Sequence, residues 1–217
     1  MTMNRIFFSI LFLGILYSCQ DQVYEFSCDP EINEFVVKNE DELSQVSVKE
    51  LATYELPLQK AVFTSWDPQK KRDAWIRKLG KVIASDTLTQ EGVSHIRKLI
   101  SHIRTGYFEA ENLQNDGDAN RLFADEWLNT AKNRLGWTEQ FIAFLVYRLY
   151  TESYQFNAEL SELRAFRTRS LSGSESSGCD CNTSSDYCGS YSCRSGGCST
   201  SSGCGWLWSG SCNGTCH

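Results

Sequence analysis

Residues 179–217 read CDCNTSSDYCGSYSCRSGGCSTSSGCGWLWSGSCNGTCH, and we call this stretch the tail. It contains eight of the ten cysteines of the chain, namely Cys179, Cys181, Cys188, Cys193, Cys198, Cys204, Cys212 and Cys216. About 40 residues cannot bury enough apolar surface to be stable through a hydrophobic core alone, so cross-links must lower the entropy of the unfolded state. We therefore predict a small C-terminal module that four disulfides hold together.

The pairing of the tail cysteines stays open, because eight cysteines can pair in about 105 ways. Thiolates also bind zinc, but the tail has no C-x-x-C pair and its one histidine is the terminal His217. A chain exported to an oxidising compartment forms disulfides rather than metal-thiolate centres. We therefore expect no metal ion and no other cofactor.

The N-terminus has the features of an export signal. Arg5 supplies a positive charge, and residues 6–16 form an apolar run that is too short to span a bilayer. The sequence LYSC, which ends at Cys19, resembles a bacterial lipobox, in which cleavage leaves the cysteine as a lipidated N-terminal residue. We expect residues 1–19 to be a lipoprotein signal and Cys19 to be the membrane anchor. An ordinary secretory signal is the alternative.

The middle of the chain has the pattern of amphipathic helices. Asp67 followed by Pro68 predicts a helix start, since aspartate caps the first turn and proline fits the first helical position. Residues 141–150 are nearly all apolar, as in the most buried helix of a bundle. No run in residues 47–165 alternates with the period of a strand, so we predict an all-α domain over this range.

Two segments flank the predicted domain. Residues 20–46 are interpreted as a tether and entry segment, because Asp29 and Pro30 are expected to interrupt regular structure there. Residues 166–178 are rich in glycine and serine, which predicts a flexible linker. The predicted fold class is therefore mainly α, with a helical bundle domain followed by a flexible linker and a small disulfide-rich C-terminal module over residues 179–217.

Composition and motifs argue against two classes of function. The formal net charge is −6, whereas nucleic-acid binding requires a concentrated positive field, so we expect no nucleic-acid partner. The chain lacks H-E-x-x-H, G-x-S-x-G and a glycine-rich phosphate loop, so we expect no enzymatic activity. His95 and His102, about 10 Å apart along one predicted helix, are expected at the surface. The basic side chains of residues 70–81 are expected to form a solvated helix face.

Three stretches of the tail carry a distinctive pattern: residues 179–188 (CDCNTSSDYC), residues 203–208 (GCGWLW) and residues 212–214 (CNG). This pattern resembles the bacteriocin fulvocin C-related proteins. Residues 56–61 (LPLQKA), together with the Asp-Pro helix start, resemble the long precursors of that family. The likeness to the bacteriocin peptide itself covers only the tail.

The resemblance implies an exported precursor of a cysteine-rich antibacterial peptide. The helical region would be its leader or carrier, and the tail would act on the bacterial envelope or on a surface receptor of a related strain. The expected location is the cell envelope of a Gram-negative bacterium, with the tail released if the linker is cleaved. Gly210 stands where the family's peptide has a cysteine, and Cys216 follows the last motif instead, which implies a rearranged bridge.

A second hypothesis keeps the tail attached. In it the chain is a lipoprotein, held in the lipid membrane through Cys19, whose stapled tail is a permanent binding or adhesion module. Trp206, Leu207 and Trp208 are candidate contacts to a membrane or target, because an exposed apolar patch with tryptophan suits the membrane boundary. The alternative is that a tryptophan packs on the disulfides. Cys28 has no predicted partner and is a lone thiol if the tail pairs internally.

Overall fold

The computed structural model describes residues 22–85, 88–115, 117–149, 180–188 and 191–217. These residues are mainly helical, with a small disulfide-rich strand region at the C-terminal end, as predicted. The helices are α1 (Pro30–Lys38), α2 (Glu40–Leu43), α3 (Val48–Leu51), α4 (Leu56–Ser65), α5 (Pro68–Ala84), α6 (Gln90–His102), α7 (Ala110–Asn115), α8 (Gly117–Asn133) and α9 (Glu139–Val146).

Asp-Pro pairs start two of these helices. Asp67 caps α5 through its side chain, which accepts the backbone N–H of Lys70, as the sequence predicts. Asp29 caps α1 in the same way, with Pro30 as the first helical residue. The expected break in regular structure at Asp29 and Pro30 is therefore wrong: α1 and α2 lie in the predicted tether and entry segment, and both pack against α4.

The most apolar helix lies in the middle of the core. Thr138 caps α9 by accepting the backbone N–H of Phe141, and five successive residues of α9, 142–146, are buried. This confirms the prediction of a central buried helix. The helix ends at Val146, earlier than the apolar run itself.

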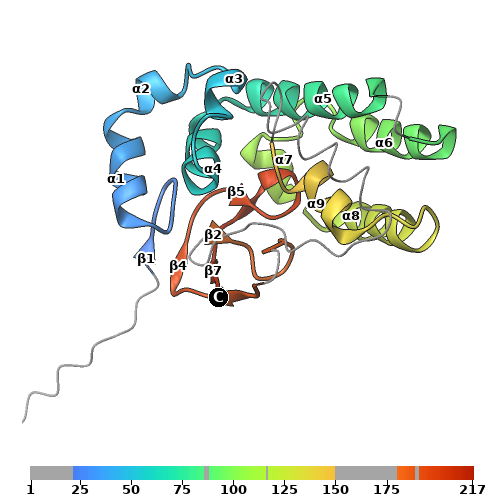
Figure 1. Ribbon diagram of the computed structural model, residues 1–217. Coiled ribbons are helices and arrows are strands. Elements are labelled where there is room, and N and C mark those ends of the chain that lie inside the picture. Colours follow the sequence, from blue (N-terminus) through green and yellow to red (C-terminus); the bar gives the residue numbers. More distant parts are fainter. Residues whose placement is uncertain (1–21, 86–87, 116, 150–179, 189–190) are drawn as a thin grey trace, which may run out of the picture.

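The strands are short and gather the C-terminal residues into three small sheets. Their bounds are β1 (Gln22–Val23), β2 (Asp180–Cys181), β3 (Cys193–Ser195), β4 (Cys198–Ser199), β5 (Gly203–Cys204), β6 (Gly210–Ser211) and β7 (Gly214–Cys216), with Trp206–Trp208 in a 3₁₀ turn between β5 and β6. β2, β7 and β3 form an antiparallel sheet in that order, β5 pairs with β6, and β1 pairs in parallel with β4. Figure 1 shows these tail strands, in orange and red, below α4 and between α1 and α9.

Tail and helices share one hydrophobic core. Trp206, Leu207 and Trp208 belong to the same cluster of buried side chains as the helices, while a second cluster consists of tail cysteines. The expectation that the tail is a self-contained module, stable through its own disulfides, is therefore corrected. A segment this short cannot enclose two indole rings, and the helices supply the missing apolar partners. The predicted linker, residues 166–178, lies outside the described residues.

Two side chains expected at the surface are buried. His95 of α6 is 8% exposed and stacks on Trp127 of α8, and its Nε2 lies 3.1 Å from the Trp127 carbonyl oxygen. Lys78 of α5 is fully buried, and its Nζ donates to carbonyl groups at the end of α9, including Phe144. A positive charge is favourable there because the last carbonyls of a helix carry a partial negative charge. The basic face of α5 is thus not wholly solvated.

Candidate functional site: the junction between tail and helices

The structure pairs seven tail cysteines and one cysteine outside the tail. Three disulfides lie within the tail and join Cys181 to Cys193, Cys188 to Cys216 and Cys204 to Cys212. The fourth joins Cys198 to Cys28, 170 residues away. Four disulfides inside the tail were the expectation, and Cys28 was expected to be a lone thiol; the Cys28–Cys198 bond corrects both. Cys179 and the predicted lipid anchor Cys19 lie outside the described residues.

Backbone pairing brings Cys28 to Cys198. β1 aligns with β4 so that Gln22 is opposite Cys198, and Tyr24 N–H donates to Ser199 O at 2.9 Å. The two Cα atoms of the disulfide are 5.8 Å apart, within the range that a disulfide spans. Sequence reasoning had no signal for this bond, because a pairing across 170 residues depends on which segments meet in the fold.

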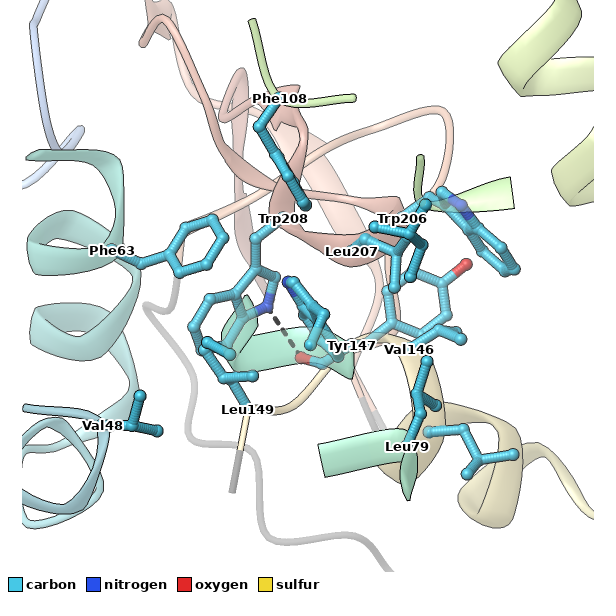
Figure 2. Close-up of a cluster of buried hydrophobic side chains, with 14 of the residues drawn as sticks. Val48, Phe63, Leu79, Phe108, Val146, Tyr147, Leu149, Trp206, Leu207 and Trp208 are labelled. Carbon is cyan, nitrogen blue, oxygen red and sulfur yellow. Dashed lines mark hydrogen bonds between the residues drawn. The ribbon is translucent and has the colours of Figure 1, made fainter. Parts of the chain in front are cut away.

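Trp208 joins the tail to three parts of the helical body. Its ring lies edge-on to Phe63 of α4, with centroids 5.3 Å apart, and to Trp75 of α5, with centroids 5.8 Å apart. Its Nε1 donates to the carbonyl of Tyr147, just after α9, at 2.9 Å. Figure 2 shows this bond and the surrounding apolar side chains. The indole is therefore satisfied at both its apolar and its polar end.

The predicted exposed patch is absent at this turn. Trp208 and Leu207 are 0% exposed and Trp206 is 6% exposed, with the Trp206 ring 5.4 Å from that of Trp127 in α8. The assignment of these three residues as membrane or target contacts is thus corrected: they are internal contacts. Leu207 and Trp208 have φ angles of 53° and 55°, in the left-handed region that costs energy for such residues. Burial of both side chains offsets that strain.

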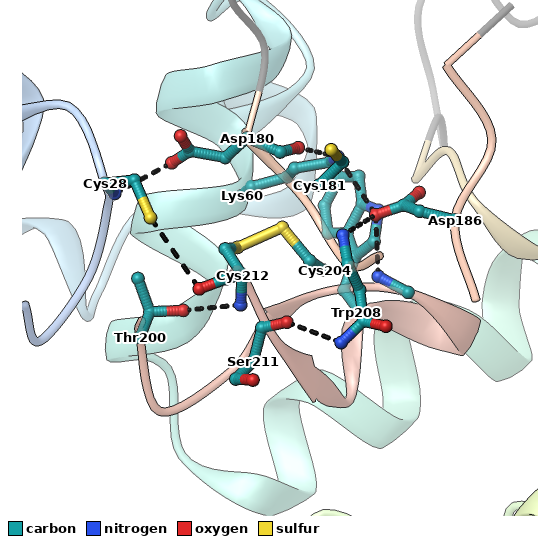
Figure 3. Close-up of a disulfide and its surroundings, with 12 residues drawn as sticks. Cys28, Lys60, Asp180, Cys181, Asp186, Thr200, Cys204, Trp208, Ser211 and Cys212 are labelled. Carbon is teal, nitrogen blue, oxygen red and sulfur yellow. Dashed lines mark hydrogen bonds and ion pairs between the residues drawn. A yellow bond between two sulfur atoms is a disulfide. The ribbon is translucent and has the colours of Figure 1, made fainter. Parts of the chain in front are cut away.

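A buried ion pair lies beside the Cys204–Cys212 disulfide (Figure 3). Lys60 of α4 places its Nζ 3.8 Å from Asp186 Oδ2, and the side chains are 4% and 1% exposed. The Lys60 ammonium also donates to the carbonyl of Asp180 at 2.8 Å. The Asp186 carboxylate accepts backbone N–H groups of the tail, including that of Gly205 at 2.9 Å. Each charge thus has several partners, as buried charges require.

The Asp180 side chain makes a second polar connection to the body. Ser27 Oγ donates to Asp180 Oδ2 at 2.7 Å, and the N–H of Cys28 donates to the same oxygen at 3.0 Å. Burial raises the pKa of Asp180, while the bonds from Ser27 and Cys28 and the charge of Lys60 oppose that rise. This contact and the Cys28–Cys198 disulfide both hold the tail to the residues just before α1.

A glycine allows the tail to approach α4. Gly203 has a φ of +108°, and a Cβ atom there would be 2.7 Å from Thr64 Oγ1 and 3.3 Å from the Lys60 carbonyl oxygen. Both the backbone conformation and the space therefore require glycine. The GCGWLW motif, which contains this glycine, thus serves docking onto the helices.

Comparison with known proteins identifies no relative of this chain. The chain matches no protein-family model, no curated protein and no solved structure. Within the described ranges, none of the helices is both long enough and apolar enough to cross a membrane.

The junction uses its polar groups for attachment. The buried carboxylates and the ammonium of Lys60 bond to one another and to the backbone, which is typical of a structural network rather than of groups that act on a substrate. The Sγ atoms of Cys181, Cys188 and Cys193, all of them in disulfides, lie within 4.8 Å of one another. Apart from that group, the arrangement joins the tail firmly to the helices.

Proposed function

We propose that this protein is an exported envelope lipoprotein that works as one intact body, with the tail as a permanent binding module carried by the helices. The Cys28–Cys198 disulfide is the observation that carries this proposal. If the chain were cut anywhere between α9 and β2, the tail would still be attached covalently to residue 28. Trp206 and Trp208 would also have to leave the core of the helical body before the tail could diffuse away.

The outward side of the tail supplies a surface for binding. We call Tyr191, Ser192, Arg194, Ser195 and Gly196 the β3 face; all five are exposed, and Tyr191 is 40% exposed. A tyrosine among small polar residues is typical of recognition surfaces, because the ring gives contact area and serine and glycine adapt their hydrogen bonding. The proposed partner is a component of the bacterial envelope or a surface receptor.

Release of the tail as a bacteriocin-like peptide is the second candidate function, and the fulvocin-like motifs favour it. Release would require both cleavage in the predicted linker and reduction of the Cys28–Cys198 bond. The freed tail would then expose the indoles of Trp206 and Trp208. These requirements make the two candidates distinguishable by simple analysis of the mature protein.

The experiment is mass spectrometry of the protein from the envelope and from the medium of an expressing Gram-negative host. We expect an intact chain that begins at a lipidated Cys19, with the tail attached whether or not the sample is reduced. A Cys19→Ala variant should lose the lipid mass and leave the membrane fraction. A free tail in the medium without reductant, inhibitory to related strains, would contradict the proposal and support the bacteriocin precursor.

A further inference from the structure

Two disulfides of the tail form one sulfur cluster. The Sγ atoms of Cys181, Cys188 and Cys193 all lie within 4.8 Å of one another. Cys216, the disulfide partner of Cys188, is directly opposite Cys193 in the β3–β7 pairing. All four belong to the second apolar cluster of the described residues, in which only Cys193 is partly exposed. Four sulfur atoms thus share one largely water-free site.

Backbone pairing also brings three of the four cysteines together, since Cys181, Cys193 and Cys216 lie in β2, β3 and β7 of one sheet. β7 lies between β2 and β3, and Ser192 and His217 exchange two backbone hydrogen bonds of 2.9 and 3.0 Å at its end. A Cβ at Gly214 would be 2.4 Å from the Arg194 carbonyl oxygen and 2.9 Å from Cys193 Sγ. Glycine at this position therefore allows the strands and the sulfur atoms to approach closely.

We propose that the reduced tail binds one Zn²⁺ ion through Cys181, Cys188, Cys193 and Cys216, so that the cluster has a disulfide state and a metal state. Zinc takes four thiolates in a tetrahedron at about 2.3 Å, which separates the sulfur atoms by roughly 3.8 Å. After reduction, the two bonded sulfur pairs must separate to that distance, while the unbonded sulfur atoms of the group already lie within 4.8 Å of one another. Among the residues that the structure describes, no other group of three potential ligands is this compact.

The conversion between the states is balanced in electrons and protons. Each disulfide takes two electrons and two protons from an external dithiol, which itself becomes a disulfide. The four thiols then release their protons to solvent as they bind the metal. Zinc with four thiolates carries a formal charge of −2. Lys60, whose Nζ is bound to the carbonyl just before Cys181, supplies positive charge near it.

The test uses the full chain, reduced with a phosphine and titrated with Co²⁺ and then with Zn²⁺ against a chromophoric chelator. We expect one Co²⁺ per reduced chain, with the intense thiolate charge-transfer and tetrahedral ligand-field bands, and displacement by Zn²⁺. The oxidised chain should take up no metal at this site. A reduced chain that takes up no metal would overturn the proposal.

Matched variants locate the site. Cys181→Ser/Cys193→Ser should weaken binding by more than the roughly 10- to 100-fold that loss of an outer-shell partner costs. Cys204→Ser/Cys212→Ser, Cys28→Ser/Cys198→Ser and Cys179→Ser should keep it. Loss of metal in any of these three controls that matches the loss in the first variant overturns the assignment of ligands.

Replacing one cysteine ligand by histidine distinguishes loss of a ligand from misfolding of the variant. Cys216→His keeps four potential ligands, so we expect retained Zn²⁺ binding and a Co²⁺ spectrum shifted to that of three sulfurs and one nitrogen. An unshifted spectrum would remove Cys216 from the ligand set and overturn the four-cysteine site. The proposal does not rest on the function proposed above, since metal uptake by the reduced chain is independent of lipid anchoring and of release.

Discussion

The helical body and the tail reach stability by different routes, and the junction joins the two. The core of the helical body consists of aliphatic and aromatic side chains. The tail contributes to that core and also has a separate buried cluster made of cysteines. Nevertheless, Trp208 of the tail is buried in the core of the body, and Cys198 of the tail forms a disulfide with Cys28. A disulfide-rich segment at the end of a chain can thus be part of a larger fold rather than a separate domain.

Removal of the junction disulfide should have the largest effect on this shared stability. The Cys28–Cys198 bond closes a separation of 170 residues, against 8 for Cys204–Cys212. Loop entropy predicts that Cys28→Ser/Cys198→Ser lowers the free energy of unfolding by about 5 kcal/mol, and Cys204→Ser/Cys212→Ser by about 2.5 kcal/mol. Denaturant unfolding followed by circular dichroism measures both. Equal losses would show that the long bond stabilises the protein no more than the short one does, and would contradict the prediction.

Truncation of the buried indole tests whether tail and helices unfold together. Trp208→Ala removes a fully buried ring between α4 and α5, and we expect a loss of about 3–5 kcal/mol in the helical unfolding transition. Tyr191→Ala, on the β3 face, is the control and should change this transition by less than about 0.5 kcal/mol. If the helical signal of the Trp208 variant unfolds as in the unmodified protein, the body and tail have separate cores.

The buried ion pair is expected to contribute somewhat less. Lys60→Met removes the ammonium from the junction and leaves the buried Asp186 carboxylate with backbone donors only, which should cost about 3 kcal/mol. Lys38→Met, which breaks the exposed pair between Lys38 and Glu34, should cost less than about 1 kcal/mol. Thermal unfolding of the two variants compares them directly, and similar shifts in both would remove the special role of the Lys60 contact.

The smallest expected effect is a pH dependence from the body alone. Burial lowers the pKa of His95 from 6.5; the positive charges of Lys98 and Arg134 lower it further, while the bond to Trp127 and the charge of Glu126 oppose this. The unfolded chain therefore takes up the proton first as pH falls. The contribution of neutral His95 to the free energy of unfolding is fully present above pH 6.5, and it is lost as the pH falls toward the pKa of His95 in the folded protein.

A variant isolates this titration from other acidic effects. Between about pH 8 and about pH 5, the melting temperature of the unmodified protein should fall more steeply than that of His95→Gln, whose side chain does not titrate. Parallel curves for the two proteins would show that His95 does not couple pH to stability. Because His95 belongs to α6 and stacks on Trp127 of α8, the comparison reports on the body.

Local signals predicted the helices well and the sites poorly. Asp67 with Pro68 and Thr138 mark true helix starts, because capping acts within one turn of the chain. The same Asp-Pro signal at residue 29 also starts a helix, and its interpretation as a break in structure was the error. The sequence predicts surface positions for His95 and Lys78, whereas packing against α8 and α9 buries them.

The sequence by itself determined that helices would form the body and that cysteines would cross-link the tail. Helix periodicity acts over three or four residues, and the need for cross-links follows from length and composition. Only the tertiary structure decided that Cys198 bonds to Cys28 and that Trp208 packs between α4 and α5. A disulfide partner and a buried surface both depend on which distant segments meet, and no local pattern encodes that.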